Sequence, residues 1–495
     1  MACARQGGVW RSSLVAWLGS LLALTAATLL VSSYAAACCS AHRPEPARQV
    51  ALCRAATYFV SPEGSDENPG TEARPWRTIG KAAETLLAGD TVYIKTGTYR
   101  ERVAPRNGGS AGMYITYAAY PGAAVTLDGA GTVLPDDLAG LFELNNVSYV
   151  RVAGLRVTHA RPHPDNAGIL VLRSSYITIE NNSTLDTTSS GIGVWESEHV
   201  SVAFNTIQHA CNGGHQECLT VAGTRAFEVR GNRVLDCHKE GLDAKDGASD
   251  GKICGNEIVR AQAVGIYVDA WDKHTYNIEV FSNTVRDTLD NNGFALASEM
   301  GGLLENVCVY NNLAYHNRYC GLVVTTNGPG GASGQHPMRG IYVLNNSFHD
   351  SGWETWGGGI AVDNPDARGV VVRNNICSQN LYFQMAVAAA VAPQNVSIDH
   401  NLIDGFRGTE GETRGRDSVE GDPRFLNASV GDFHLRAGSP AIDRGSADRA
   451  PGDDFDGRAR PQDGDGNGTT AYDIGAFESV WHNRHVYLPV ARKRR

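Results

Sequence analysis

Short runs of alternating hydrophobic and polar positions follow one another through the middle of the chain, and each run ends in the same way. A β-branched residue, two variable residues and an asparagine recur nine times, for example as IENN, VRGN and VLNN. Successive asparagines of this pattern lie 23 to 34 residues apart. They are Asn182, Asn205, Asn232, Asn256, Asn283, Asn312, Asn346, Asn375 and Asn401. A period in this range indicates stacked units that bury their apolar faces against one another.

The repeat predicts an all-β fold, a right-handed parallel β-helix of about ten or more coils. Alternating strand residues place Val and Ile of every coil in one buried column. Asparagine tolerates the left-handed backbone of a sharp bend, and its amide can hydrogen-bond to the asparagine of the next coil. Before the first coil, five apolar residues share one helical face and predict a helix that caps the column. They are Ile79, Ala82, Ala83, Leu86 and Leu87.

Both ends of the chain predict segments outside the β-helix. An apolar run from Leu14 to Val31, followed by three alanines at 35–37, is typical of an export signal, with a retained membrane anchor as the alternative. We therefore expect a secreted or cell-surface protein. The predicted segments are a signal peptide (1–37), a linker (38–55), the β-helix with its N-terminal cap (56–412), a C-terminal module (413–480) and a basic tail (481–495).

The net charge and the cysteine content limit the classes of partner that the protein can bind and indicate its cellular compartment. The net charge of -10 argues against nucleic-acid binding, because phosphate recognition needs a basic surface. Cleavage after Ala37 would leave ten of the eleven cysteines, an even number that is compatible with disulfides in an exported chain. Cys211 and Cys237 occupy similar places in successive repeats and are the predicted pair. We expect a monomer.

One coil departs from the repeat on its outward face. Aligning the coils on the glycine that opens one strand pairs GLDAK with GIYVD of the next coil. The aliphatic residues of both segments are expected to point inward, so the residues between them point outward. The predicted outward patch is formed by Asp243, Lys245, Tyr267 and Asp269, and the flanking turns add His238, Glu240, Trp271, Asp272, Lys273, His274 and Glu299. Aromatic rings beside carboxylates and a lysine are typical of a sugar-binding site.

The N-terminal segment 56–104 and the asparagine repeats together resemble secreted right-handed β-helix proteins related to polysaccharide lyases, notably the ninth and sixth lyase families. The resemblance covers about residues 56–405 and implies cleavage of an acidic, uronate-containing polysaccharide by calcium-assisted β-elimination. Sixth-family lyases carry a Glu five residues before the catalytic Lys, as Glu240 and Lys245 stand here. Ninth-family lyases similarly join an acidic calcium site to a lysine base. The arginine of sixth-family enzymes has no clear equivalent, and Arg260 is only a spatial candidate.

These comparisons assign expected roles within the patch. Lys245 would be the base if partial burial or Lys273 lowered its pKa, with Asp243 and Asp269 beside it as catalytic residues. Mannuronan epimerases have a similar arrangement, with His in place of the lysine. The expected calcium ligands are Glu240, Asp243, Asp269 and Asp272. The expected substrate-binding residues are His238, Tyr267, Trp271, Lys273, His274 and Glu299.

Two other functions remain open at this point. A glycoside hydrolase would use a carboxylate pair from Asp243, Asp269, Asp272 and Glu299. A non-enzymatic β-helix would bind glycans at a cell surface, as a structural or recognition protein. The hypothesis of an enzyme is favoured because the charged residues concentrate on the coils between residues 215 and 300.

Two further segments have candidate functions. SGWETWGGG at 351–359 offers Trp353, Glu354 and Trp356 as a second sugar-stacking loop, or as aromatic packing over the coil edge. The segment from Asp422 onward resembles a C-terminal module often associated with surface attachment. Within it, the D-x-D-x-N-G sequence at 463–468 is similar to the start of a calcium loop, or forms a solvated turn.

Overall fold

The computed structural model describes residues 55–354 and 356–481. The predicted signal peptide, the linker up to residue 54 and all but the first residue of the predicted basic tail lie outside these ranges. Within them, no helix has the length and apolar character needed to cross a membrane.

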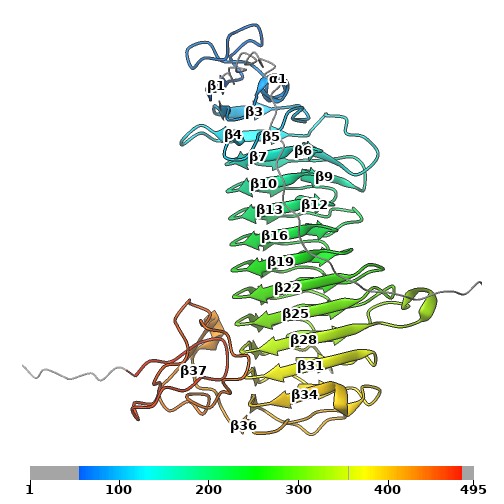
Figure 1. The fold of residues 1–495 in the computed structure, drawn as a ribbon, viewed down its shortest axis with the longest axis vertical. Helices are drawn as coiled ribbons and strands as arrows, with labels where there is room; N and C mark the ends of the chain where they lie inside the picture. The colour runs from blue at the N-terminus through cyan, green and yellow to red at the C-terminus, as the bar shows by residue number, and fades with distance from the viewer. Residues whose placement is uncertain (1–54, 355, 482–495) are drawn as a thin grey trace, which may run out of the picture. The chain divides into compact units, whose positions relative to one another are not determined.

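The described chain winds into a parallel β-helix of three sheets, as the asparagine repeat predicts (Figure 1). The first sheet has 13 strands: β1 (Thr57–Val60), β2 (Thr91–Ile94), β4 (Ile115–Ala119), β7 (Ser148–Ala153), β10 (Ser175–Glu180), β13 (Glu198–Ala203), β16 (Arg225–Arg230), β19 (Ser249–Cys254), β22 (Thr275–Phe281), β25 (Leu304–Tyr310), β28 (Met338–Leu344), β31 (Ala367–Arg373) and β34 (Val396–Asp399). The second sheet also has 13: β3 (Gly97–Tyr99), β5 (Val125–Asp128), β8 (Arg156–Thr158), β11 (Ser183–Leu185), β14 (Thr206–Gln208), β17 (Arg233–Leu235), β20 (Glu257–Val259), β23 (Thr284–Arg286), β26 (Leu313–Tyr315), β29 (Ser347–His349), β32 (Ile376–Ser378), β35 (Leu402–Asp404) and β36 (Val419–Glu420).

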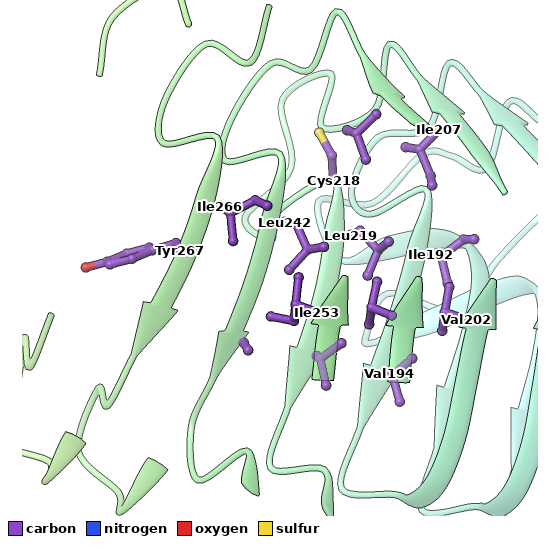
Figure 2. Packing of buried hydrophobic residues seen from close by; sticks show 14 of the residues in the cluster. Ile192, Val194, Val202, Ile207, Cys218, Leu219, Leu242, Ile253, Ile266 and Tyr267 are labelled. Atoms are coloured by element: carbon purple, nitrogen blue, oxygen red, sulfur yellow. The ribbon is translucent and has the colours of Figure 1, made fainter. Parts of the chain in front are cut away.

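The third sheet carries the predicted patch. Its ten strands are β6 (Ala139–Asn145), β9 (Asn166–Leu172), β12 (Ile192–Trp195), β15 (Leu219–Ala222), β18 (Leu242–Lys245), β21 (Ile266–Asp269), β24 (Phe294–Ala297), β27 (Leu322–Thr325), β30 (Gly358–Val362) and β33 (Phe383–Val387). Each strand pairs with the equivalent strand of the next coil, so one inward residue stacks on the next. Figure 2 shows Leu219, Leu242 and Ile266 among the buried side chains and Tyr267 pointing away from them.

A short helix covers the N-terminal end of the β-helix. At the N-terminus, α1 (Ile79–Thr85) is capped by Thr78, whose Oγ1 accepts from the Lys81 amide at 3.1 Å. Four of the five predicted apolar residues join the core, whereas Leu87 is 58% exposed. The prediction for Leu87 was wrong because the helix ends before it, and the chain turns toward β2 at Asp90, whose Oδ2 accepts from the Leu87 amide.

The last described part of the chain returns along the second sheet. It contains the antiparallel hairpin β37 (Phe425–Asn427) and β38 (Asp432–Leu435). Phe433 and Phe477 pack with Tyr315 of β26, and the Gly475 amide donates to the Asn374 carbonyl at 2.7 Å. This segment therefore packs against the side of the β-helix.

The asparagines form a buried ladder along the bend after the first sheet. Asn232 Nδ2 donates to Asn256 Oδ1 at 3.0 Å and to the Val202 carbonyl at 2.9 Å, and the same pattern repeats from Asn182 to Asn375. The left-handed backbone lies one residue earlier than predicted, at positions such as Asn181, Gly231 and Gly255. The ladder asparagine is needed for its amide, because its side chain satisfies backbone groups that the bend leaves unpaired.

Asn256→Ala is expected to lower the free energy of unfolding by about 2–4 kcal/mol, since the Asn232 amide and the Val229 carbonyl lose their partners inside the bend. Thermal unfolding followed by circular dichroism measures the effect. The matched control is Asn427→Ala, whose exposed side chain accepts only from Ser429 Oγ. Equal melting temperatures for the two variants would show that the ladder does not stabilise the coils.

Candidate functional site

The outward columns of the third sheet have the predicted register. Thr220 pairs with Asp243 and Asp243 with Tyr267, while Ala222 pairs with Lys245. Together with the turns on either side, these strands line a cleft of about 540 Å³. Its lining residues are Trp195, His215, Gln216, Glu217, Lys239, Glu240, Asp243, Lys245, Asp246, Tyr267, Asp269, Trp271 and Glu299. The cleft therefore brings one lysine of the third sheet, Lys245, together with six carboxyl groups.

Lys245 is held by an ion pair. Its Nζ lies 2.7 Å from Glu217 Oε1, and the two side chains are 15% and 7% exposed. Glu217 Oε2 accepts in turn from Thr220 Oγ1 at 3.1 Å. The Lys245 ammonium also lies 5.7 Å from the ring centroid of Trp195, because the intervening residue of the column is the small Ala222.

The protonation of Lys245 differs from the expectation. Burial acts to lower its pKa, but the negative charges of Glu217 and Asp243 outweigh burial and raise it above the ordinary value. Lys273, expected to assist in lowering it, is exposed and does not line the cleft. Lys245 is therefore an ammonium in the protein alone.

Asp243 and Asp269 are buried acids, each with one unpaired oxygen. Each is 2% exposed, and the Oδ1 atom of each has no hydrogen-bond partner among the described residues. Burial, reinforced by Glu217, raises the pKa of Asp243 well above its usual range. Burial and the charge of Glu299 raise the pKa of Asp269 to about 8. Keeping two such groups costs folding free energy, which is typical of functional sites.

The wall toward the later coils is a hydrogen-bonded trio. The Tyr267 hydroxyl donates to Glu299 Oε1, and Asn327 Nδ2 donates to the Tyr267 oxygen at 2.8 Å. Asn327 opens the glycine-rich loop of 327–337. Burial raises the pKa of both Tyr267 and Glu299, so the phenol stays protonated.

A disulfide joins the two turns at the other wall. Cys218 is bonded to Cys237, not Cys211 to Cys237 as predicted, and Cys211 Sγ lies 3.4 Å from Cys218 Sγ. The prediction was wrong because Cys218, directly before β15, lies in register with the turn that follows Cys237. Cys211 lies instead at the beginning of the loop that leads to β15. Since Cys218 follows Glu217 directly, the bond positions the partner of Lys245 against the turn that carries Glu240.

Four predicted site residues lie outside the cleft. They are His238, Asp272, Lys273 and His274. His274 Nε2 bonds to Glu305 Oε2 at 2.9 Å, and the His238 ring lies 6.3 Å from that of His209. For the three residues after Trp271 the physical reason is the direction of the chain, which turns toward the first sheet and enters β22 at Thr275. Trp271, by contrast, lines the cleft with 43% of its surface exposed.

Sequence reasoning assigned no role to the residues that precede β15. Glu217 and Glu240 each stand two residues before paired leucines, Leu219 and Leu242, so the register could have joined them. Trp195 was missed because its side chain reaches Lys245 across a whole coil. Asp246 also lines the cleft, and burial raises its pKa.

The donor set of the cleft fits a hard cation in part. Glu240 Oε2, Asp243 Oδ1 and Asp269 Oδ1 are buried oxygens without hydrogen-bond partners among the described residues, which is the chemistry that calcium prefers. Asp272, the fourth expected ligand, is exposed and does not line the cleft. Among the residues described, the carboxylates already within 4.8 Å of one another lie instead in the C-terminal segment: Asp443, Asp463 and Asp465.

Family comparisons agree with this architecture. The family described as "Pel9A-like, right handed beta helix region" matches residues 58–217, and the one described as "Right handed beta helix region" matches residues 139–298. The second match contains the cleft strands β15, β18 and β21. The predicted handedness is thereby confirmed, and the chain is a right-handed β-helix whose first coils are similar to the Pel9A-like family.

Individual relatives extend the comparison. The chain is 25% identical over 443 residues to the uncharacterized protein YwoF of Bacillus subtilis (strain 168), covering 77% of this chain and 91% of that protein. It is 36% identical over 77 residues to pectate lyase PEL9 of Emericella nidulans, covering 15% of this chain and 19% of the lyase. The crystal structure of pectate lyase Pel9A superposes with a TM-score of 0.54 at 16% identity, covering 86% of this chain and 96% of that one. The structural similarity shows that the two proteins share the β-helix fold.

Proposed function

We propose that this protein cleaves a uronate-containing polysaccharide by β-elimination in the cleft of the third sheet, with Lys245 as the base. One observation carries the proposal: a buried lysine lies among carboxyl groups whose oxygens lack partners, on the outward face of adjacent coils. A solvated strand face would have exposed, paired side chains. This arrangement is suited to binding charge and moving a proton.

The reaction removes the proton on the carbon next to the uronate carboxylate and breaks the bond to the 4-linked oxygen. The Lys245 amine takes that proton, the electron pair forms a carbon–carbon double bond, and the leaving oxygen takes a proton from water. Lys245 must first be neutral, which requires that the negative charges of Glu217 and Asp243 no longer stabilise its ammonium form. Calcium held by Glu240, Asp243 and Asp269 would supply that change of charge and neutralise the substrate carboxylate.

A hydrolase remains the second candidate, favoured by one observation. Asp269, with a pKa of about 8, carries a proton at neutral pH and is competent to protonate a glycosidic oxygen. A second carboxyl group of the cleft, such as Glu217, would then act on water or on the sugar. In this mechanism Lys245 binds substrate.

An assay of the purified protein on pectate, alginate and glycosaminoglycans separates these functions. Elimination creates an unsaturated product that absorbs in the ultraviolet, and the expected result is an absorbance rise that chelator abolishes and calcium restores. New reducing ends without absorbance would replace the lyase by the hydrolase. Binding with neither product would support the glycan-binding alternative. The same proposal includes export and attachment at the cell surface, since the substrate is an extracellular polymer. It also includes a monomeric state.

A further inference from the structure

A second group of exposed side chains lies on the same edge of the β-helix as the cleft. Trp353, Trp356 and Tyr382 expose 54%, 44% and 40% of their surfaces. Arg318 and Tyr319 lie beside them on the preceding turn. We call these five residues the aromatic platform. Large aromatic rings exposed together on a soluble protein mark a binding surface.

The register places the platform in line with the cleft. Tyr319 stands three residues before Leu322 of β27, and Leu322 stacks through β24 and β21 onto Leu242 of β18. Lys239 of the cleft stands three residues before Leu242, so both residues occupy the same position on their turns. Tyr382 has this position before Met385 of β33. With strands about 4.8 Å apart, the platform begins roughly 15 Å from the cleft turn along the coil axis.

The two tryptophans are joined by an antiparallel backbone bridge, and we call this feature the hairpin. The Trp353 amide donates to the Trp356 carbonyl at 2.9 Å, and the Trp356 amide donates back at 3.2 Å. Gly352 and Gly357 flank the hairpin with φ of 118° and 123°, where any side chain would be strained. The Trp356 ring packs edge-on against Tyr319 at 5.6 Å between centroids. The hairpin therefore holds its rings before any ligand arrives, which lowers the entropic cost of binding.

Arg318 adds a positive charge without an anion. Its guanidinium carbon lies 4.4 Å from the centroid of the Trp353 ring, and its Nε is buried with no hydrogen-bond partner. Within the described ranges, no carboxylate lies within 4.0 Å of this guanidinium. Stacking on tryptophan fixes the planar fork and leaves its donors free for an acceptor.

We propose that the aromatic platform is a distal subsite that binds uronate residues of the polysaccharide whose cleavage point lies in the cleft. This inference rests on the proposed function and names a second binding region for the same polymer. Sugar rings stack on Trp353 and Trp356, and Arg318 pairs with a uronate carboxylate. A substrate long enough to span both regions gains affinity that a short oligosaccharide lacks.

Binding is measured by affinity electrophoresis and calorimetry with polygalacturonate, in the Lys245→Gln background so that the polymer stays intact. Trp353→Ala and Arg318→Gln are each expected to weaken polymer binding about tenfold. Trp353→Phe, which keeps a ring, should recover most of it. The matched controls are Trp481→Ala, an equally exposed tryptophan, and Arg368→Gln, an exposed arginine on β31 of the first sheet.

The outcomes separate this inference from the proposed function. With Lys245 intact, the platform variants should retain activity on short oligogalacturonates and lose it on dilute polymer through a higher KM. If the wild type cleaves polymer and the variants bind and cleave it equally well, the subsite is refuted while the function stands. If polymer is never cleaved but the variants still lose binding, the subsite stands and the lyase is refuted. Equal weakening toward a neutral polysaccharide would refute the pairing of Arg318 with a uronate.

Discussion

Lys245→Gln will lower kcat on the uronate polymer by about 10²–10⁴-fold, because a general base contributes an effect of that size and glutamine cannot take the proton. KM is expected to change little. Initial rates of ultraviolet absorbance at saturating calcium measure both constants. A raised KM with an unchanged kcat would contradict the role of base and make Lys245 a substrate-binding residue.

Two variants control for damage to the fold. Lys252→Gln removes an exposed lysine from β19 of the first sheet and should leave activity and melting temperature unchanged. Lys245→Gln also leaves the Glu217 carboxylate buried without its partner. Removing one partner of a buried ion pair lowers the free energy of unfolding by about 3–5 kcal/mol. The double variant Lys245→Gln/Glu217→Gln should recover that stability without recovering activity. Recovery of both would show that Lys245 acts only through the fold.

Asp269→Asn will stabilise the metal-free protein above neutral pH while abolishing its activity. The pKa of Asp269 is raised to about 8 in the folded chain, so the folded state binds the proton more tightly than the unfolded one. The free energy of unfolding therefore falls as pH rises from the unfolded pKa of about 4, by up to about 1.4 kcal/mol per pH unit, and levels off above the folded pKa. Asparagine cannot ionise and removes this contribution.

Melting temperatures from pH 4 to pH 9 in chelator test this linkage. The gap between Asp269→Asn and the wild type should be small at the acid end and largest at the alkaline end. Asp137→Asn, at an exposed position before β6, should follow the wild type throughout. A constant gap across this range would mean that the pKa of Asp269 is not raised on folding, and would contradict the linkage. Calcium should narrow the gap if Asp269 is a ligand.

The architecture was predictable because its determinants are local and repeated. Strand alternation placed Asp243 and Lys245 on the outward face, and the glycine that opens each strand aligned Asp243 with Tyr267. Both predictions are confirmed by the register of β15, β18 and β21. The asparagine ladder was likewise visible, although the left-handed residue lies one position earlier. These features recur in every coil, so an error in the alignment of one repeat can be recognised from the repeats on either side.

The electrostatics of the site were not predictable in the same way. The pKa of Lys245 was expected to fall, but Glu217, 28 residues earlier, raises it. That contact depends on the path of the loop before β15, and the Cys218–Cys237 disulfide helps to fix this path. Lys273 and His274 were expected near the patch, but they lie on a turn whose direction no local pattern reveals.

The repeating sequence by itself determined the stacked coils, the inward columns and the outward face on which the patch lies, because alternation and period are properties of neighbouring residues. Only the tertiary structure decided that Glu217 pairs with Lys245, that Asp243 and Asp269 keep buried oxygens unpaired, and that the aromatic platform lines up with the cleft. Burial and charge at one point sum over side chains from several coils, and the lengths and paths of the connecting turns decide which side chains meet.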